Sequence, residues 1–125
     1  MYDRVFEFLD SAPGVARDRQ EAWEADRWLI GGKMFAMRGG DKTGRPVLTL
    51  KLPPMESDVM RAAFPGMVIP GYYMNKLHWS SLYLDSKLPE EDALRMAQSA
   101  YEHFVSSLPK KRREEIRGVS SRAPS

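Results

Sequence analysis

Apolar residues recur at helical spacing near both ends of the chain. The residues that predict a short first helix are Tyr2, Val5, Phe6 and Leu9. Pro13-Gly14 ends this helix. A long last helix is predicted to begin at Pro89. Proline is favoured in the first turn of a helix, because the N–H group that it lacks would have no partner within the helix there. The apolar stripe of this helix, which Pro109 ends, consists of Leu94, Ala97, Tyr101, Phe104, Val105 and Leu108.

The middle of the chain has the period of two that is typical of strands. One strand is predicted over residues 47–52, where Leu48, Leu50 and Leu52 share a buried face. Another is predicted over residues 78–85, where His78, Ser80 and Leu82 alternate with Trp79, Ser81 and Tyr83. A short helix is expected between these strands, around Val59 and Met60, ending at Phe64-Pro65.

An earlier strand is predicted over residues 27–37, with Gly31-Gly32 as a bulge or bend within it. Trp23 is expected to start a further short strand. Residues 39–46 are rich in turn formers and predict a hairpin loop, whereas the polar residues 15–21 predict a loop without strand structure.

The predicted order of elements favours an α+β fold in two layers, an antiparallel sheet with helices packed mainly on one face. The chain has 125 residues, of which 42% are hydrophobic, enough for one domain with one core. We place this domain at residues 1–113. Residues 114–125 are expected to form a flexible tail, because the last residue of the apolar stripe is Leu108.

The absence of Cys excludes disulfides, thiolate chemistry and cysteine-type zinc sites. The apolar runs are too short to span a membrane, and acidic residues interrupt the N-terminal segment, so no signal peptide is predicted. By elimination, we expect a cytoplasmic protein that does not bind membranes.

The net charge of +2 is unevenly distributed along the chain. Residues 1–30 and 88–108 each carry −3, whereas residues 31–87 and 109–125 each carry +4. Such asymmetry can mark an anion-binding face, although it is equally compatible with ordinary solvated charge. The basic run from Lys110 to Arg113 can likewise attract phosphates, or it can be a solubilising segment that stabilises the end of the preceding helix.

No catalytic constellation is apparent. His78 and His103 are far apart in the sequence and lack the spacing of metal ligands. Ser80 and Ser81 lie near His78, but no oxyanion-hole motif accompanies them. We therefore predict no catalytic residue, metal or cofactor. General acid–base catalysis by His78 is the weakest of the functional hypotheses.

The segment Pro70–Trp79 is the richest in functional groups. Lys76 can contact a phosphate, and Asn75 can read a base edge or hold a turn. The aromatic residues Tyr72, Tyr73 and Trp79 can stack on bases or fill the core. Burial gives no reason for Lys76 or His78, so we expect both to be functional and Trp79 to be part of the core.

Four stretches together resemble the MmcQ/YjbR-like family. These stretches are Gly31-Gly32-Lys33-Met34-Phe35-Ala36, Leu50-Lys51-Leu52-Pro53-Pro54, Pro70-Gly71-Tyr72-Tyr73-Met74-Asn75-Lys76-Leu77-His78-Trp79 and Leu108-Pro109-Lys110-Lys111. Their order and spacing match nearly the whole chain up to Arg113, and the Asn-Lys-x-His-Trp element is the most specific part. Residues 15–26 and 114–125 add nothing to the match.

The resemblance implies a two-layer fold with an antiparallel sheet, and it transfers no known enzymatic activity to this chain. The family is commonly described as DNA-binding through a double-wing arrangement of hairpins. Here the wings would involve residues 39–46 and the region around Asn75-Lys76. The first wing is not strongly basic, because it contains only Lys42 and Arg45 as cations and Asp41 partly offsets their charge.

The leading hypothesis is therefore a DNA-binding protein that uses a positive sheet face and the basic C-terminal segment. The alternative is a module that binds a small anionic ligand or a protein partner around Asn75, Lys76, His78 and Trp79. The candidate nucleic-acid-binding residues are Lys33, Arg38, Lys42, Arg45, Lys51, Asn75, Lys76, His78, Lys110, Lys111, Arg112 and Arg113.

Overall fold

The computed structural model describes residues 1–71 and 75–121, so the predictions for Tyr72 and Tyr73 lie outside the described residues. In chain order the elements are α1 (Asp3–Ser11), β1 (Ala16–Gln20), the 3-10 helix η1 (Glu21–Trp23), β2 (Ala25–Ile30), β3 (Lys33–Gly40), β4 (Pro46–Lys51), α2 (Pro54–Ala63), β5 (Val68–Pro70), β6 (Trp79–Tyr83), α3 (Glu90–Ser106) and α4 (Lys110–Ser121). The predicted α+β class is confirmed.

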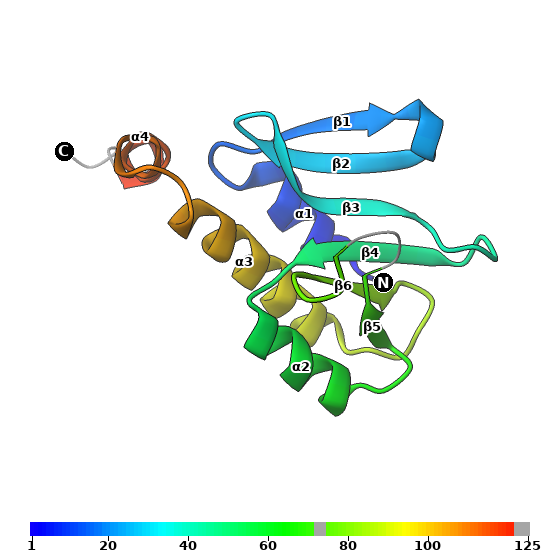
Figure 1. Ribbon diagram of the computed structural model, residues 1–125. Helices are drawn as coiled ribbons and strands as arrows, with labels where there is room; N and C mark the ends of the chain where they lie inside the picture. Colours follow the sequence, from blue (N-terminus) through cyan, green and yellow to red (C-terminus); the bar gives the residue numbers. More distant parts are fainter. Residues whose placement is uncertain (72–74, 122–125) are drawn as a thin grey trace.

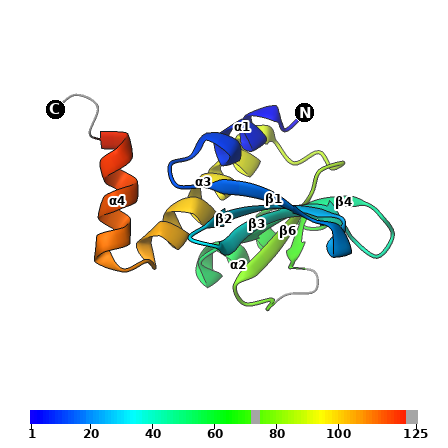
Figure 2. The same ribbon diagram turned by 90° about the horizontal axis from the view of Figure 1, so that it is seen from above.

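The strands form one antiparallel sheet in the order β1-β2-β3-β4-β6-β5 (Figure 1). Helices α1 and α3 pack against each other and lie along one face of this sheet (Figure 2). Strand alternation directs alternate apolar side chains into this layer, where each is almost completely buried. The largest of them are Trp28, Ile30, Leu48, Leu50 and Leu82.

Phe35 joins the sheet to α3. The pairing of β2 with β3 shifts between Trp28 and Leu29, which leaves Phe35 as an extra residue at a β-bulge. Its ring lies 6.1 Å from the ring of Tyr101 and 5.8 Å from that of Phe104. The bulge therefore directs an additional aromatic side chain into the core.

The structure corrects two predictions around this bulge. Gly31-Gly32 is not a bulge but the two-residue turn of the β2–β3 hairpin, with φ of +60° and +79°. Glycine adopts such left-handed angles readily, which explains the pair. Residues 15–21 were predicted as a loop because they are polar. They instead contain β1, an edge strand whose exposed side chains need no apolar pattern.

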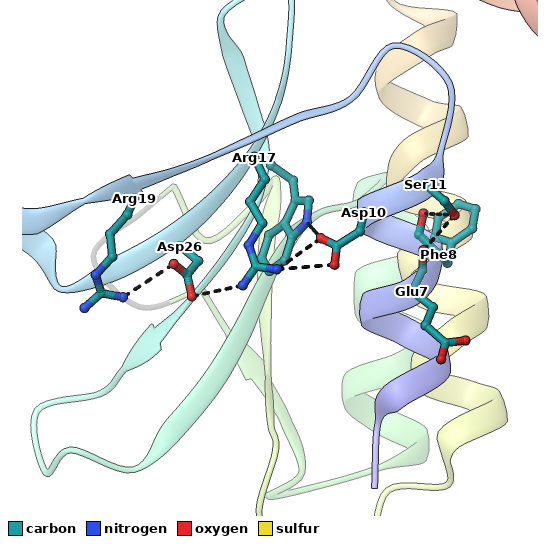
Figure 3. A network of polar contacts seen from close by, with 8 residues as sticks. Glu7, Phe8, Asp10, Ser11, Arg17, Arg19 and Asp26 are labelled. Atoms are coloured by element: carbon teal, nitrogen blue, oxygen red, sulfur yellow. Dashed lines mark hydrogen bonds and ion pairs between the residues drawn. The ribbon is translucent and has the colours of Figure 1, made fainter.

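A polar network ties α1 to the edge of the sheet (Figure 3). Asp10 accepts hydrogen bonds from Trp28 Nε1 at 2.8 Å and from Arg17 Nη1 at 3.2 Å. Arg17 and Arg19 each also pair with Asp26, at 3.4 Å. The cations of β1 are thereby neutralised by acids of α1 and β2.

The C-terminal segment differs from the predicted flexible tail. Residues Lys110–Ser121 form α4, and Ile116 is buried. A Cβ atom at Gly14 would lie only 3.1 Å from the Ile116 side chain, so this isoleucine packs on the turn after α1. Isolated apolar residues in a polar stretch were too weak a signal to predict this contact.

Candidate functional site

The register of β4 with β6 defines two ends of the central sheet. Val47 lies opposite Tyr83 near the turn of the β3–β4 hairpin, and Lys51 lies opposite Trp79 at the other end. At a rise of about 3.3 Å per residue, these two ends are roughly 13 Å apart. We call the first the hairpin end (residues 40–46, Tyr83 and Asp85) and the second the lysine end (Lys33, Lys51 and residues 75–79).

The lysine end collects cations from three parts of the chain. Lys33 begins β3, Lys51 ends β4, and Lys76 lies in the turn before β6. Lys33 and Lys76 are exposed, whereas Lys51 is half-buried. Within residues 1–71 and 75–121, none of these three ammonium groups has an ion-pair partner.

Asn75 holds the turn that presents Lys76. Its Oδ1 accepts the N–H of Leu77 at 2.9 Å, and its carbonyl oxygen accepts those of His78 and Trp79 at 3.2 and 3.0 Å. This is the local bonding for which Asn is favoured in turns. Of the two roles proposed for Asn75, the turn-holding one is thus observed, and its side-chain oxygen is already engaged.

Arg61 of α2 fastens the same segment, and sequence analysis missed it. Its guanidinium donates to the carbonyl oxygens of Lys76 at 2.7 Å and Trp79 at 2.8 Å, and to Ser80 Oγ at 3.1 Å. A single arginine in a short amphipathic helix carries no sequence signal for such a role.

Gly71 also fixes this segment through a close approach. Its N–H donates to the Trp79 carbonyl at 2.8 Å, and a Cβ atom at this position would come within 2.6 Å of Trp79 Cβ. Gly71 and Trp79 are therefore packed closely together, next to the turn that presents Lys76.

The faces predicted around Trp79 need correction. His78 precedes β6 instead of starting it, so strand alternation does not place His78 and Lys76 together. The layer of α1 and α3 receives Leu82 and Ser80, whereas Trp79 lies on the opposite face and is only half-buried. Trp79 is thus not a core residue of the helix-covered face. His78 is half-buried, and its carbonyl oxygen accepts the N–H of Leu52 at 2.9 Å.

The hairpin end is a closed network. Arg45 pairs with Asp85 at 2.7 Å, and its Cζ lies 3.6 Å from the centre of the Tyr83 ring. Asp41 accepts hydrogen bonds from Thr43 Oγ1 at 2.6 Å, from the N–H groups of Thr43 and Arg45, and from Tyr83 Oη at 3.2 Å. The hydrogen bond from the Thr43 hydroxyl, with smaller contributions from the other three, outweighs the opposing effect of desolvation and lowers the pKa of the Asp41 carboxyl.

Of the other predicted residues, Arg38 lies apart from both ends of the sheet. Its Cζ is 4.4 Å from the centre of the Phe6 ring of α1, on the helix-covered face. Lys42 is exposed on the β3–β4 hairpin. The two wings suggested by the family resemblance, residues 39–46 and Asn75-Lys76, therefore lie at opposite ends of the β4–β6 pair.

The basic run from Lys110 to Arg113 begins α4 beside the β2–β3 turn (Figure 1). Arg112 Nη2 is 3.4 Å from the position of a Cβ atom at Gly31, and this guanidinium also pairs with Glu115 at 3.2 Å. Arg113 donates to the carbonyl oxygens of Ser106 and Leu108 at the end of α3. The start of α4 thus adjoins the turn that leads to Lys33.

The other two cations of the run differ in their pairing. Lys110 lies 4.0 Å from Glu114, one turn further along α4. Lys111 has no ion-pair partner in the described part of the chain, and it is exposed. Lys111 is therefore the cation of this run that is most available to a ligand.

No group of three or more His, Asp or Glu side chains within the described residues is arranged to hold a metal ion. Across residues 1–71 and 75–121, no helix is both long enough and apolar enough to cross a membrane.

The antiparallel sheet with helices packed on one face makes this an α+β protein. The sequence model of the YjbR family matches residues 10–103, and the chain belongs to this family. It is 27% identical to the uncharacterised protein YjbR of Escherichia coli K12 over 110 residues, 88% of this chain and 92% of that protein. It is 32% identical to the uncharacterised protein YbdF of Escherichia coli O157:H7 over 94 residues, 75% of each chain.

Two solved structures share the fold. A DUF419-domain protein of Deinococcus radiodurans superposes with a TM-score of 0.80 at 24% identity, covering 91% of this chain and 86% of that one. A Pseudomonas syringae protein superposes with a TM-score of 0.68 at 19% identity, covering 82% of this chain and 98% of that one. At these identities the likeness concerns the fold alone.

Proposed function

We propose that this protein binds nucleic acid through the phosphates, and that the lysine end of the sheet makes the contacts. The observation that carries this proposal is that Lys33, Lys51 and Lys76 all lie at one end of the sheet and that none of them has an acidic partner among the described residues. Gathering like charges opposes folding unless a ligand or solvent compensates them. A polyanion is the ligand that such an arrangement favours.

The start of α4 extends this surface. Arg112 lies against the turn before Lys33, and the neighbouring Lys111 is exposed and unpaired in the described part of the chain. Arg45, Arg38 and Arg113 contribute less in this proposal, because each is engaged by groups of the protein itself.

Trp79 gives the surface an aromatic group. It lies opposite Lys51 in the register and is half-buried on the sheet face turned away from α1 and α3. An indole beside a lysine can stack on an unpaired base while the ammonium contacts a phosphate. We therefore expect single-stranded DNA to bind at least as well as duplex, with little sequence preference. A nucleic-acid ligand also agrees with the cytoplasmic location expected from the sequence.

The experiment is fluorescence anisotropy of labelled single- and double-stranded DNA over a salt series. Changing Lys33, Lys51 and Lys76 together to Ala should weaken binding to all sequences. It should also lower the slope of log affinity against log salt by up to about 2.7 on duplex, at about 0.9 per phosphate contact. The matched control changes three exposed cations elsewhere, Arg4, Lys87 and Arg95, and should leave the slope unaltered.

If both triple variants lost the same amount of DNA affinity, the loss would be explained by net charge alone, and the assignment of the binding site to the lysine end would be overturned. Absence of binding to either DNA at low salt would overturn the proposal itself. Should the lysine end instead bind inorganic phosphate tightly and DNA not at all, the alternative of a small anionic ligand would replace it.

A further inference from the structure

A hollow lies away from the lysine end, on the sheet face opposite α1 and α3. It has a volume of about 660 Å³ and lies between η1 and the β3–β4 hairpin. Its lining includes Trp23, Glu24, Ala25, Met37, Gly39 and Asp41. This volume falls in the range of sites that hold small molecules.

The lining of the hollow combines small residues with an aromatic one. A Cβ atom at Gly39 would lie 3.4 Å from Ala25 Cβ, so these two small residues lie close together, and they line the hollow with Met37. Trp23 is 53% exposed, which is unusual for so large an apolar side chain. Nothing in the packing of the core requires an indole at this place.

The charge of the hollow is negative, in contrast to that of the lysine end. Glu24 and Asp41 line it, and no Lys or Arg is among its described lining residues. Arg27 lies outside the lining: its Cζ is over the Trp23 ring, 5.7 Å from the ring centre, and its guanidinium is paired with Asp18 at 2.6 Å. Asp41 is already held by the hairpin network, so Glu24 supplies the available charge.

The local structure around the hollow does not account for a glutamate at position 24. Its φ of 51° is left-handed, where glycine or asparagine would be less strained. Within residues 1–71 and 75–121, its carboxylate has neither a hydrogen bond nor an ion pair. Local packing therefore gives no reason for a glutamate here, whereas a cationic ligand would.

We propose that this hollow binds a small organic cation, with an ammonium or guanidinium group against the Trp23 indole and beside the Glu24 carboxylate. An aromatic face and an unpaired carboxylate are the two groups that recognise such cations. This site is separate from the proposed phosphate surface, and neither proposal depends on the other.

The test follows amide and indole chemical shifts of the full chain during titration with choline and with agmatine, as ammonium and guanidinium probes. The matched control ligand is 3,3-dimethylbutan-1-ol, the uncharged isostere of choline. We expect saturable shifts at Trp23, Gly39 and Gly44 with at least one cation. The isostere should bind about tenfold more weakly, since it lacks the cation–π and charge interactions.

Glu24→Gln retains the shape of the side chain and should lower the affinity for the cation by a similar factor of about ten. Trp23→Ala should remove saturable binding. Glu21→Gln is the control, because Glu21 begins the 3-10 helix that Glu24 follows, but it pairs with Arg19 and does not line the hollow. Equal binding of the isostere, undiminished binding by Glu24→Gln, or preference for an uncharged nucleoside over both cations would each overturn the proposal.

Discussion

The two ends of the β4–β6 pair differ in whether their cations are paired with acidic groups of the protein. At the hairpin end, Arg45 is held between Asp85 and the Tyr83 ring, and Asp41 gathers four donors around the turn. At the lysine end, the backbone is held as firmly, by Arg61 and Asn75, but the lysine side chains have no acidic partners within residues 1–71 and 75–121. The difference shows that a hairpin can be basic in sequence and yet have little charge to offer a ligand.

At the lysine end, the largest expected effect comes from removing the arginine that orders it. Arg61→Ala deprives the Lys76 and Trp79 carbonyls and the buried Ser80 hydroxyl of a charged donor. We expect unfolding free energy to fall by about 3 kcal/mol, the scale for losing charge-assisted hydrogen bonds. Urea denaturation measures this loss. Arg61→Lys, which cannot reach three acceptors with one fork, should recover only part of it.

A smaller loss is expected for Trp79→Ala. The sequence predicted a core tryptophan, whose removal would cost about 3–5 kcal/mol. Because Trp79 is only half-buried and lies on the face away from α1 and α3, we now expect about 2 kcal/mol. Trp28→Ala is the comparison, since Trp28 is fully buried in the helix-covered layer and should show the full core cost. Similar losses for the two variants would show that the faces have been misassigned.

The architecture could be predicted from the sequence where burial produces a regular pattern. The apolar stripe of α3 and the alternation of Leu48 and Leu50 led directly to the layered fold. Strand β1 escaped prediction because an edge strand held by ion pairs has no apolar pattern. Gly31-Gly32 was assigned to a bulge because a strand break and a two-residue hairpin turn share the same glycines.

The site was harder to predict than the fold, for a physical reason. Sequence reveals which residues are cationic but not which cations find acids, and that pairing depends on contacts between distant segments. Arg45 and Asp85 are 40 residues apart, and Arg61 and Lys76 are 15 apart. Lys33, Lys51 and Lys76 were named as candidates together with residues such as Arg38, and only the fold separates the two groups.

The hairpin end predicts an acid-sensitive contribution to stability. The pKa of Asp41 is lowered from its usual 3.8, chiefly by the Thr43 hydroxyl, so the network stabilises the fold fully above that value. This contribution should be lost as the pH falls through the lowered pKa. Asp41→Asn should reduce stability at neutral pH and flatten its decline below about pH 4, as measured by urea midpoints across pH. A decline as steep as that of the wild type would assign the acid sensitivity to other carboxyls.

The smallest change in stability is expected where the largest change in binding is proposed. Lys33, Lys51 and Lys76 make no ion pairs within the described residues, so changing all three to Ala removes mutual repulsion and little packing. We expect the unfolding free energy to shift by less than about 0.5 kcal/mol, and in the stabilising direction at low salt. The matched change at the hairpin end, Arg45→Ala, removes the pair with Asp85 and the contact with Tyr83, and should be destabilising. Thermal unfolding of both variants at low and high salt measures whether each change stabilises or destabilises the fold. If the triple lysine variant were the less stable of the two, these lysines would be part of the scaffold, and the contrast between the two ends of the sheet would be lost.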